Sequence, residues 1–222
     1  NSNLWLATGG VDAAWVPSYN SAGIHGLVDG NWVEVDDVEG ENDISGIRDY
    51  MAVSIDPLNP NHVMFGSFEE GLIEVLDGEI IEIWNESNST IQQGDFGGSP
   101  RTGVTGVDFD KFGNLWFTNF FSDAPLQVRL TDGTFVAMDL GDDISSSDNI
   151  GEVMVTRDGY VWVILPRGDG VLVLDPNETP SNTSDDDWRF LNIDSEHGAL
   201  PSNHVYSIEE DLDGEIWVGT GS

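Results

Sequence analysis

The chain has 222 residues, of which 41 are Asp or Glu and only 7 are Lys or Arg, so its formal net charge is −34. Contacts to nucleic-acid phosphates need many Lys and Arg side chains, and a surface this acidic repels a polyanion. We therefore exclude nucleic acid as a partner, and the same argument disfavours an anionic membrane face. The absence of cysteine excludes disulfides, zinc fingers, iron–sulfur ligation and thiol nucleophiles.

Hydrophobic residues make up 39% of the chain, and they include 8 Trp, 10 Phe and 4 Tyr. This content is enough to form a core, so the high charge does not indicate disorder. No apolar run approaches the roughly 18 residues of a membrane span, and we expect no transmembrane segment in this chain. Residues 1–5 have neither a basic nor an apolar leader region, so we expect that a signal peptide was removed or that the natural start lies elsewhere.

Five segments repeat one pattern, in which an apolar strand and a turn precede a second strand centred on an aromatic residue. The aromatic residues are Trp5, Phe65, Trp116, Trp162 and Trp217, at spacings of 60, 51, 46 and 55 residues. These spacings are close to the roughly 40 to 50 residues of a four-stranded propeller blade. Because aromatic positions that recur in register are core positions first, we expect these Trp side chains to pack between neighbouring blades.

Asp-Gly dipeptides, which favour tight hairpin turns, separate the predicted strands. They lie at residues 29–30, 77–78, 132–133, 158–159 and 213–214. The predicted strands cover residues 51–55, 62–67, 72–76 and 79–84 in the second repeat, 104–109, 115–119, 126–130 and 134–138 in the third, and 151–156, 160–165, 170–174 and 188–193 in the fourth. Residues 94–98 are glycine-rich but open no helix, so we predict a loop there and no phosphate cradle.

The predicted fold is all-β, a β-propeller of four-stranded antiparallel blades. The first repeat supplies three strands and residues 203–219 supply two, which makes 17 strands with the three complete repeats. Since a closed ring needs a multiple of four, we expect a partial ring of about four and a quarter blades, cut from a ring of roughly six to eight. The predicted domain spans residues 1–222, with blade repeats at roughly 1–50, 51–102, 103–148, 149–202 and 203–222.

Calcium is the metal to which an acidic chain points. Asp185, Asp186 and Asp187 are consecutive on a predicted loop and are the weak calcium candidates, with a solvated loop as the alternative. Asp211 and Asp213 lie in a hairpin turn, where we expect the side chains to cap their own backbone. Neither group has the ligand spacing of an EF-hand, and we expect no other cofactor.

No residue is predicted to be catalytic. The four histidines, His25, His62, His197 and His204, stand at different places in the repeat and lack a nucleophile elbow or a metal-binding spacing. We predict structural or exposed roles for them. Pairs of carboxylates carry no information about glycoside hydrolysis, because 41 acidic residues allow too many pairs.

Residues 200–208 read LPSNHVYSI, and residues 210–220 read EDLDGEIWVGT. This unit resembles the repeat of the two-component regulator propeller family, in which L-P-S-N-x-V-x-x-I precedes an E-D-x-D-G turn and x-[IL]-W-[IV]-G-T. Within that family, further segments are similar to the PorZ-type surface components of the type IX secretion system; they are residues 55–63, 66–74, 84–89, 106–119 and 185–191. The resemblance covers most of residues 50–222.

The resemblance implies an exported bacterial protein with two tandem propellers and a C-terminal domain, located at the outer membrane surface or in the periplasm. It implies a non-catalytic scaffold or adaptor whose partners are proteins of the secretion and sortase machinery. A surface polysaccharide is a further candidate partner. The scarcity of Lys and Arg argues against an anionic polysaccharide, because such a ligand is bound through basic residues.

Two alternatives share the repeat. One is the periplasmic ligand-sensing propeller of a hybrid two-component histidine kinase. The other is an enzyme that resembles the streptogramin lyases, whose chemistry would need a His and a Glu at the ring centre. We expect no histidine at such an inward position, so the sequence favours binding over catalysis.

Overall fold

The computed structural model describes residues 3–12, 16–35, 43–138, 140, 144 and 150–221. Every regular element in these ranges is a β-strand, which confirms the all-β prediction. Among the same residues there is no helix that is long and apolar enough to span a membrane.

The strands form five main antiparallel sheets in chain order. The first sheet contains β1 (Leu4–Leu6), β2 (Ile24–Val28) and β3 (Asn31–Val35). The second contains β4 (Tyr50–Ile55), β5 (His62–Ser67), β6 (Leu72–Leu76) and β7 (Glu79–Trp84). The third contains β10 (Val104–Phe109), β11 (Leu115–Asn119), β12 (Leu126–Arg129) and β13 (Phe135–Ala137). The fourth contains β14 (Val153–Val155), β15 (Val161–Leu165), β16 (Gly170–Asp175) and β17 (Asp187–Leu191), and the fifth contains β18 (Val205–Glu210) and β19 (Ile216–Thr220).

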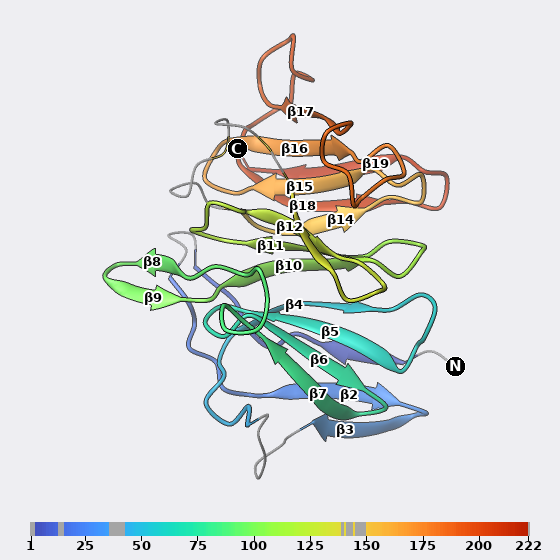
Figure 1. Cartoon of the computed structure of the whole chain (residues 1–222). Helices are drawn as coiled ribbons and strands as arrows, with labels where there is room; N and C mark the ends of the chain where they lie inside the picture. The colour runs from blue at the N-terminus through green and yellow to red at the C-terminus, as the bar shows by residue number, and fades with distance from the viewer. Residues whose placement is uncertain are drawn as a thin grey trace.

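The first four sheets stand one above another in the order of the chain, from the blue first sheet to the orange fourth sheet (Figure 1), and contacts between β15 and β18 place the fifth sheet beside the fourth. Strand β10 packs against β4 on one side and β14 on the other, so the first strands of the second, third and fourth sheets adjoin one another. Within the described ranges no sheet joins β1 to β18 or β19. The sheets therefore form an open arc of a β-propeller.

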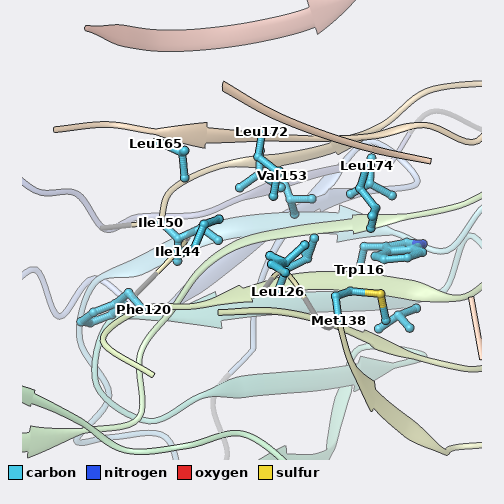
Figure 2. Close-up of a cluster of buried hydrophobic side chains, with 14 of the residues drawn as sticks. Trp116, Phe120, Leu126, Met138, Ile144, Ile150, Val153, Leu165, Leu172 and Leu174 are labelled. Atoms are coloured by element: carbon cyan, nitrogen blue, oxygen red, sulfur yellow. The ribbon is translucent and has the colours of Figure 1, made fainter. Parts of the chain in front are cut away.

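Apolar side chains of successive sheets meet in four buried clusters, one between each neighbouring pair. Between the first and second sheets, the rings of Trp5 and Phe65 pack edge to face with centroids 6.0 Å apart. Between the third and fourth sheets, Trp116 and Leu126 face Leu172 (Figure 2). Neighbouring sheets cover both faces of strands β5, β11 and β16. These strands are therefore buried along nearly their whole length.

The Asp-Gly dipeptides lie at hairpin tips, as predicted, in two conformations. Asp29 and Asp77 have φ of 49° and 54°, and the glycines after them are also left-handed, as a two-residue type I′ turn requires. At Gly133, Gly159 and Gly214 only the glycine is left-handed, and its N–H donates to the carbonyl of the third residue before it. Both conformations join strands that are adjacent in one sheet.

Residues 94–101 form a hairpin, where the sequence predicted a loop. Strands β8 (Gly94–Phe96) and β9 (Ser99–Arg101) pair antiparallel, so the described residues contain 19 strands and not the expected 17. The ring of Phe96 packs edge to face on Phe68, with centroids 5.4 Å apart. This contact comes from a distant part of the chain, which is why local composition did not reveal the hairpin.

The expectation that each repeated Trp packs between sheets holds for Trp5 and Trp116, which are buried, and for Trp162, which is partly buried against the fourth cluster. It is wrong for Trp217, which is 63% exposed. In the described part of the chain no further sheet covers that face of β19. The indole N–H of Trp217 instead donates to the Asp211 carboxylate at 2.8 Å.

Candidate functional site

The first strands of four sheets, β4, β10, β14 and β18, or the residues next to them, line a pocket of about 650 Å³. We call it the axial pocket, because β4, β10 and β14 adjoin one another in that order and β18 packs against β15 of the fourth sheet. Apolar groups form part of its wall. The polar side chains that line it are Asp12, Thr105, Glu152, Arg167, His204 and Tyr206.

Close contacts between the third and fourth sheets fix one wall of the axial pocket. Gly106 lies so near β14 that a Cβ atom there would be 2.6 Å from a backbone nitrogen of that strand. The hydroxyl of Thr105 donates to the carbonyl of Ile150 at 2.7 Å, and that of Thr118 donates to the carbonyl of Gly151 at 2.7 Å. These contacts hold the residues just before β14 in place, Glu152 among them.

Glu152 belongs to a group of three carboxylates from consecutive sheets. Burial raises the pKa of Glu152, and the charges of Glu209 and Asp108 raise it further. Burial also raises the pKa of Asp108 to about 6, although Asp108 accepts hydrogen bonds from the Val155 N–H at 2.7 Å and the Ser54 hydroxyl at 3.1 Å. Glu152 therefore holds a proton more readily than an exposed glutamate does.

The basic and phenolic groups of the axial pocket come from segments beside the fifth sheet. Arg167 follows β15, His204 precedes β18, and Tyr206 is the second residue of β18 and is 67% exposed. The N–H of Gly221 donates to the His204 carbonyl at 2.7 Å, which fixes the backbone there. A guanidinium, an imidazole, a phenol and a protonatable carboxyl group thus line one opening, which suits a polar ligand that both accepts and donates hydrogen bonds.

His204 corrects one expectation. The sequence predicted no histidine at the ring centre, and His204 lines the axial pocket. The pocket is assembled from four sheets that are far apart in the chain, so the position of His204 beside a turn gave no sign of it. His25 and His197 have the structural or exposed roles that were predicted: His25 contacts the Ala22 carbonyl at 2.6 Å, and His197 is 52% exposed beside Asp194.

His62 lies in a polar network between the second and third sheets. Its Nδ1 is 2.9 Å from the Asp56 carboxylate, and its Nε2 is 2.8 Å from the Glu74 carboxylate. Glu74 also accepts the indole N–H of Trp84 at 2.7 Å and lies 3.5 Å from the Arg129 guanidinium. These residues do not line the axial pocket. The network is therefore a contact between sheets.

The calcium candidates have separate surroundings. Asp185 accepts the hydroxyl of Thr179 at 3.0 Å, whereas Asp187 begins β17 and pairs with Asp175 of β16. Both carboxylate oxygens of Asp186 are shielded from solvent, and burial, followed by the charges of Asp185 and Asp175, raises its pKa to about 6. The described residues contain no group of three or more His, Asp or Glu side chains that could hold a metal ion. Calcium at Asp185, Asp186 and Asp187 stays a prediction.

Asp211 caps its own hairpin, as predicted. Its carboxylate accepts the backbone N–H of Asp213 at 2.9 Å and that of Glu215 at 3.0 Å. Asp110 has the same role in the third sheet, where it accepts the N–H of Asn114 at 2.9 Å. These acidic residues stabilise turns and are not part of the axial pocket wall.

Residues 199–222 match the sequence profile of the two component regulator propeller family. The matched residues include the LPSNHVYSI unit and the turn after it. The chain therefore carries a repeat of that family. A comparison with curated proteins finds no match.

Solved propeller structures are similar to this chain. PorZ of Porphyromonas gingivalis, described as an essential surface component of the type-IX secretion system, is 23% identical with a TM-score of 0.78, over 98% of this chain and 30% of PorZ. The extracellular domain of BT3049 from B. thetaiotaomicron, described as a hybrid two component system, is 18% identical with a TM-score of 0.60, over 98% of this chain and 26% of that one. A streptogramin B lyase is 17% identical with a TM-score of 0.59, over 90% of this chain and 56% of that one.

These likenesses show the β-propeller fold, and this chain spans less than two thirds of each of the three proteins. The chain is a propeller that carries a two component regulator propeller repeat and has a PorZ-like fold. By their descriptions, PorZ is a surface component and the BT3049 domain is extracellular.

Proposed function

We propose that this chain is the binding propeller of an exported surface protein, which acts as a non-catalytic scaffold or adaptor for the sortase machinery of type IX secretion at the outer membrane. The observation that carries the proposal is the likeness to PorZ, whose TM-score of 0.78 exceeds the 0.60 of the sensor domain and the 0.59 of the lyase. The stacked sheets also form an axial pocket, and such a pocket suits the binding of a partner.

The partners that fit this proposal are proteins of the secretion machinery. Glu152 and Arg167 in the axial pocket offer one acidic and one basic contact to a polar segment of such a protein. A surface polysaccharide that is uncharged would also be compatible with the chain. An anionic polysaccharide is disfavoured, because only 7 Lys and Arg residues offset 41 Asp and Glu residues, which leaves a net charge of −34.

Deletion of the gene for the full-length protein in its source bacterium tests the secretion role. We expect cargo that carries the C-terminal secretion signal to keep that signal and to be lost from the cell surface, as measured by immunoblots of cell fractions. Complementation with full-length protein carrying Arg167→Ala then tests the axial pocket, with Arg189→Ala on β17 as the matched control. Normal processing of cargo in the deletion strain would reject the secretion role.

A second candidate is the ligand-sensing propeller of a hybrid two-component kinase. Two observations favour it: the family description of the repeat at residues 199–222, and the alignment of the BT3049 domain over 98% of this chain. The test is the full reading frame and its product. A kinase domain in the same protein, with autophosphorylation that depends on a periplasmic ligand, would favour the sensor function and contradict the scaffold function.

A catalytic role has one observation in its favour, because a histidine, His204, and a glutamate, Glu152, line the same pocket. These are the residue types that general acid–base catalysis uses most often. We expect no turnover when the protein is incubated with a streptogramin B antibiotic and the products are followed by mass spectrometry. Ring opening that disappears in the His204→Ala variant but persists in His197→Ala would contradict the non-catalytic proposal.

A further inference from the structure

The network around His62 contains more hydrogen-bond acceptors than a neutral imidazole can serve. Each ring nitrogen lies within 3 Å of a carboxylate oxygen, at 2.9 Å for Asp56 and 2.8 Å for Glu74. A neutral imidazole has one N–H and one lone pair, whereas an imidazolium donates from both nitrogens. In the neutral form one carboxylate would therefore face a lone pair at hydrogen-bond distance. The geometry fits the protonated form.

The surroundings of the network come from several strands, and their charges favour the same form. On the second sheet, Asp56 lies in the turn after β4, Glu74 on β6, and Glu82 on β7 beside Glu74 in the ladder. The Asn88 side-chain amide donates a hydrogen bond to the Glu82 carboxylate at 3.1 Å. From the third sheet come the Arg129 guanidinium and two uncharged rings, those of Phe109 and Phe135. Three carboxylates thus stand near one cation besides His62.

Arg129 ties this network to the third sheet. Its guanidinium lies 3.5 Å from the Glu74 carboxylate and stacks over the Trp84 ring at 5.0 Å and the Phe135 ring at 5.9 Å. Glu74 is therefore shared between His62 in its own sheet and Arg129 in the next sheet. A change in the charge of His62 alters the position and charge balance of Glu74, and with it the contact between the sheets.

We propose that His62 is a proton-operated clamp, in which the imidazolium joins Asp56 to Glu74 and so holds Glu74 against Arg129 of the neighbouring sheet. When the proton leaves, one of the two carboxylates loses its donor and the contact between the second and third sheets loosens. This regulation goes beyond the proposed binding function and does not depend on it. The hydrogen bond that His62 donates to Glu74 is the largest influence on its pKa; burial opposes it, and the hydrogen bond donated to Asp56 adds to it. Together they raise the pKa of His62 above 6.5, which supports a clamp closed at mildly acidic pH.

Nuclear magnetic resonance of the imidazole nitrogens in the whole chain tests the clamp. We expect His62 to carry both ring protons at pH 6.5 and to titrate above that value. We also expect the Trp84 indole N–H and the Arg129 side-chain resonances to shift with the midpoint of His62. A merely structural histidine would titrate without moving these two reporters.

Two variants sharpen the test. In Glu74→Gln the midpoint of His62 should fall, because Glu74 makes the largest contribution that raises it. In His62→Gln the resonances of Trp84 and Arg129 should become independent of pH. If a variant fails to fold, the NMR titration of His62 in the unmodified chain still tests the proposal. A His62 with a single ring proton at pH 6.5, or reporters that ignore its midpoint, overturns the proposal.

Discussion

Asp108 accepts hydrogen bonds from both neighbouring sheets, yet its charge is unfavourable. The Ser54 hydroxyl and the Val155 N–H donate to it, but burial dominates and raises its pKa from 3.8 to about 6. Between these two values the folded chain binds the proton more tightly than the unfolded chain does. The contribution of Asp108 to stability therefore improves as the pH falls from 6 toward 3.8 and is least favourable above 6.

Replacing this carboxylate by a neutral amide should stabilise the protein above pH 6. The difference between 3.8 and about 6 corresponds to about 3 kcal/mol, and we expect Asp108→Asn to recover about 1 to 2 kcal/mol because the amide keeps only part of the hydrogen bonding. Denaturant unfolding over a pH series measures the effect. The gain should shrink as the pH falls to 3.8.

Asp132→Asn is the control for this prediction. Asp132 is exposed, and hydrogen bonds from Thr134 lower its pKa, so removal of its charge should bring no comparable gain. An equal gain in both variants would indicate a general effect of net charge. A gain from Asp108→Asn that does not depend on pH would contradict the explanation by burial.

Asp211 and Asp108 show which side-chain roles could be predicted from the sequence and which could not. The partners of Asp211 are Asp213, Glu215 and Trp217, all within six residues, so its capping role could be predicted from the turn motif. The donors to Asp108 come from positions 54 and 155 on two other sheets. Such partners depend on how the sheets stack, which a local pattern does not contain. The position of His204 in the axial pocket was missed for the same reason, whereas His62 has the structural role that was predicted, although its partners were not.

The strands could largely be predicted because alternating apolar residues and Asp-Gly turns are local signals. The predicted ranges of β5, β6, β7, β10 and β11 match the structure residue for residue. Hairpin β8–β9 was missed because Phe96 packs on Phe68, a contact with a distant residue that the local pattern does not contain. Strands β13 and β14 are each shorter than predicted. They pair with their neighbouring strands over fewer residues than the apolar pattern covers.

Gly106 is a position of close approach between β10 and β14 at the axial pocket wall. A methyl group at residue 106 would lie 2.6 Å from the Val153 nitrogen and 2.7 Å from the Gly151 carbonyl oxygen, and backbone atoms cannot move aside without shifting β14. We expect Gly106→Ala to destabilise the protein by about 1 to 3 kcal/mol or more, as overpacking does. Thermal and denaturant unfolding provide the measurement.

Gly46→Ala is the matched control, because a Cβ atom there meets no atom within 4 Å. Its stability should stay within about 0.5 kcal/mol of the unmodified chain. If Gly106→Ala were as stable as Gly46→Ala, the third and fourth sheets would have to lie farther apart than the structure places them.

The net charge of −34 acts on the whole arc. Few cations are present to offset it, and they include Arg48 beside Glu69, Arg129 beside Glu74 and Arg157 beside Glu210. Repulsion between unpaired carboxylates therefore opposes the compact state, and screening by salt weakens it. We expect the midpoint of thermal unfolding to rise as NaCl is added, most steeply below about 0.15 M. A midpoint that falls with salt would mean that the ion pairs dominate.

Calcium separates screening from specific binding. At matched ionic strength, screening alone should raise the unfolding midpoint equally with calcium and with magnesium. An extra rise with calcium that is lost in Asp186→Asn would instead locate a site at Asp185, Asp186 and Asp187. Asp213→Asn, in a turn that caps itself, is the control.

The wall of the axial pocket beside β14 is fixed by main-chain atoms, namely the carbonyls of Ile150 and Gly151 bound by two threonine hydroxyls and the close approach at Gly106. The side chains that a ligand would meet, among them Glu152, Arg167 and His204, project from this frame without forming it. The residues that fix the pocket wall are therefore different from the residues that would determine which ligand binds. Homologous chains can exchange these three side chains and acquire new ligands, while the arc that presents them keeps its shape.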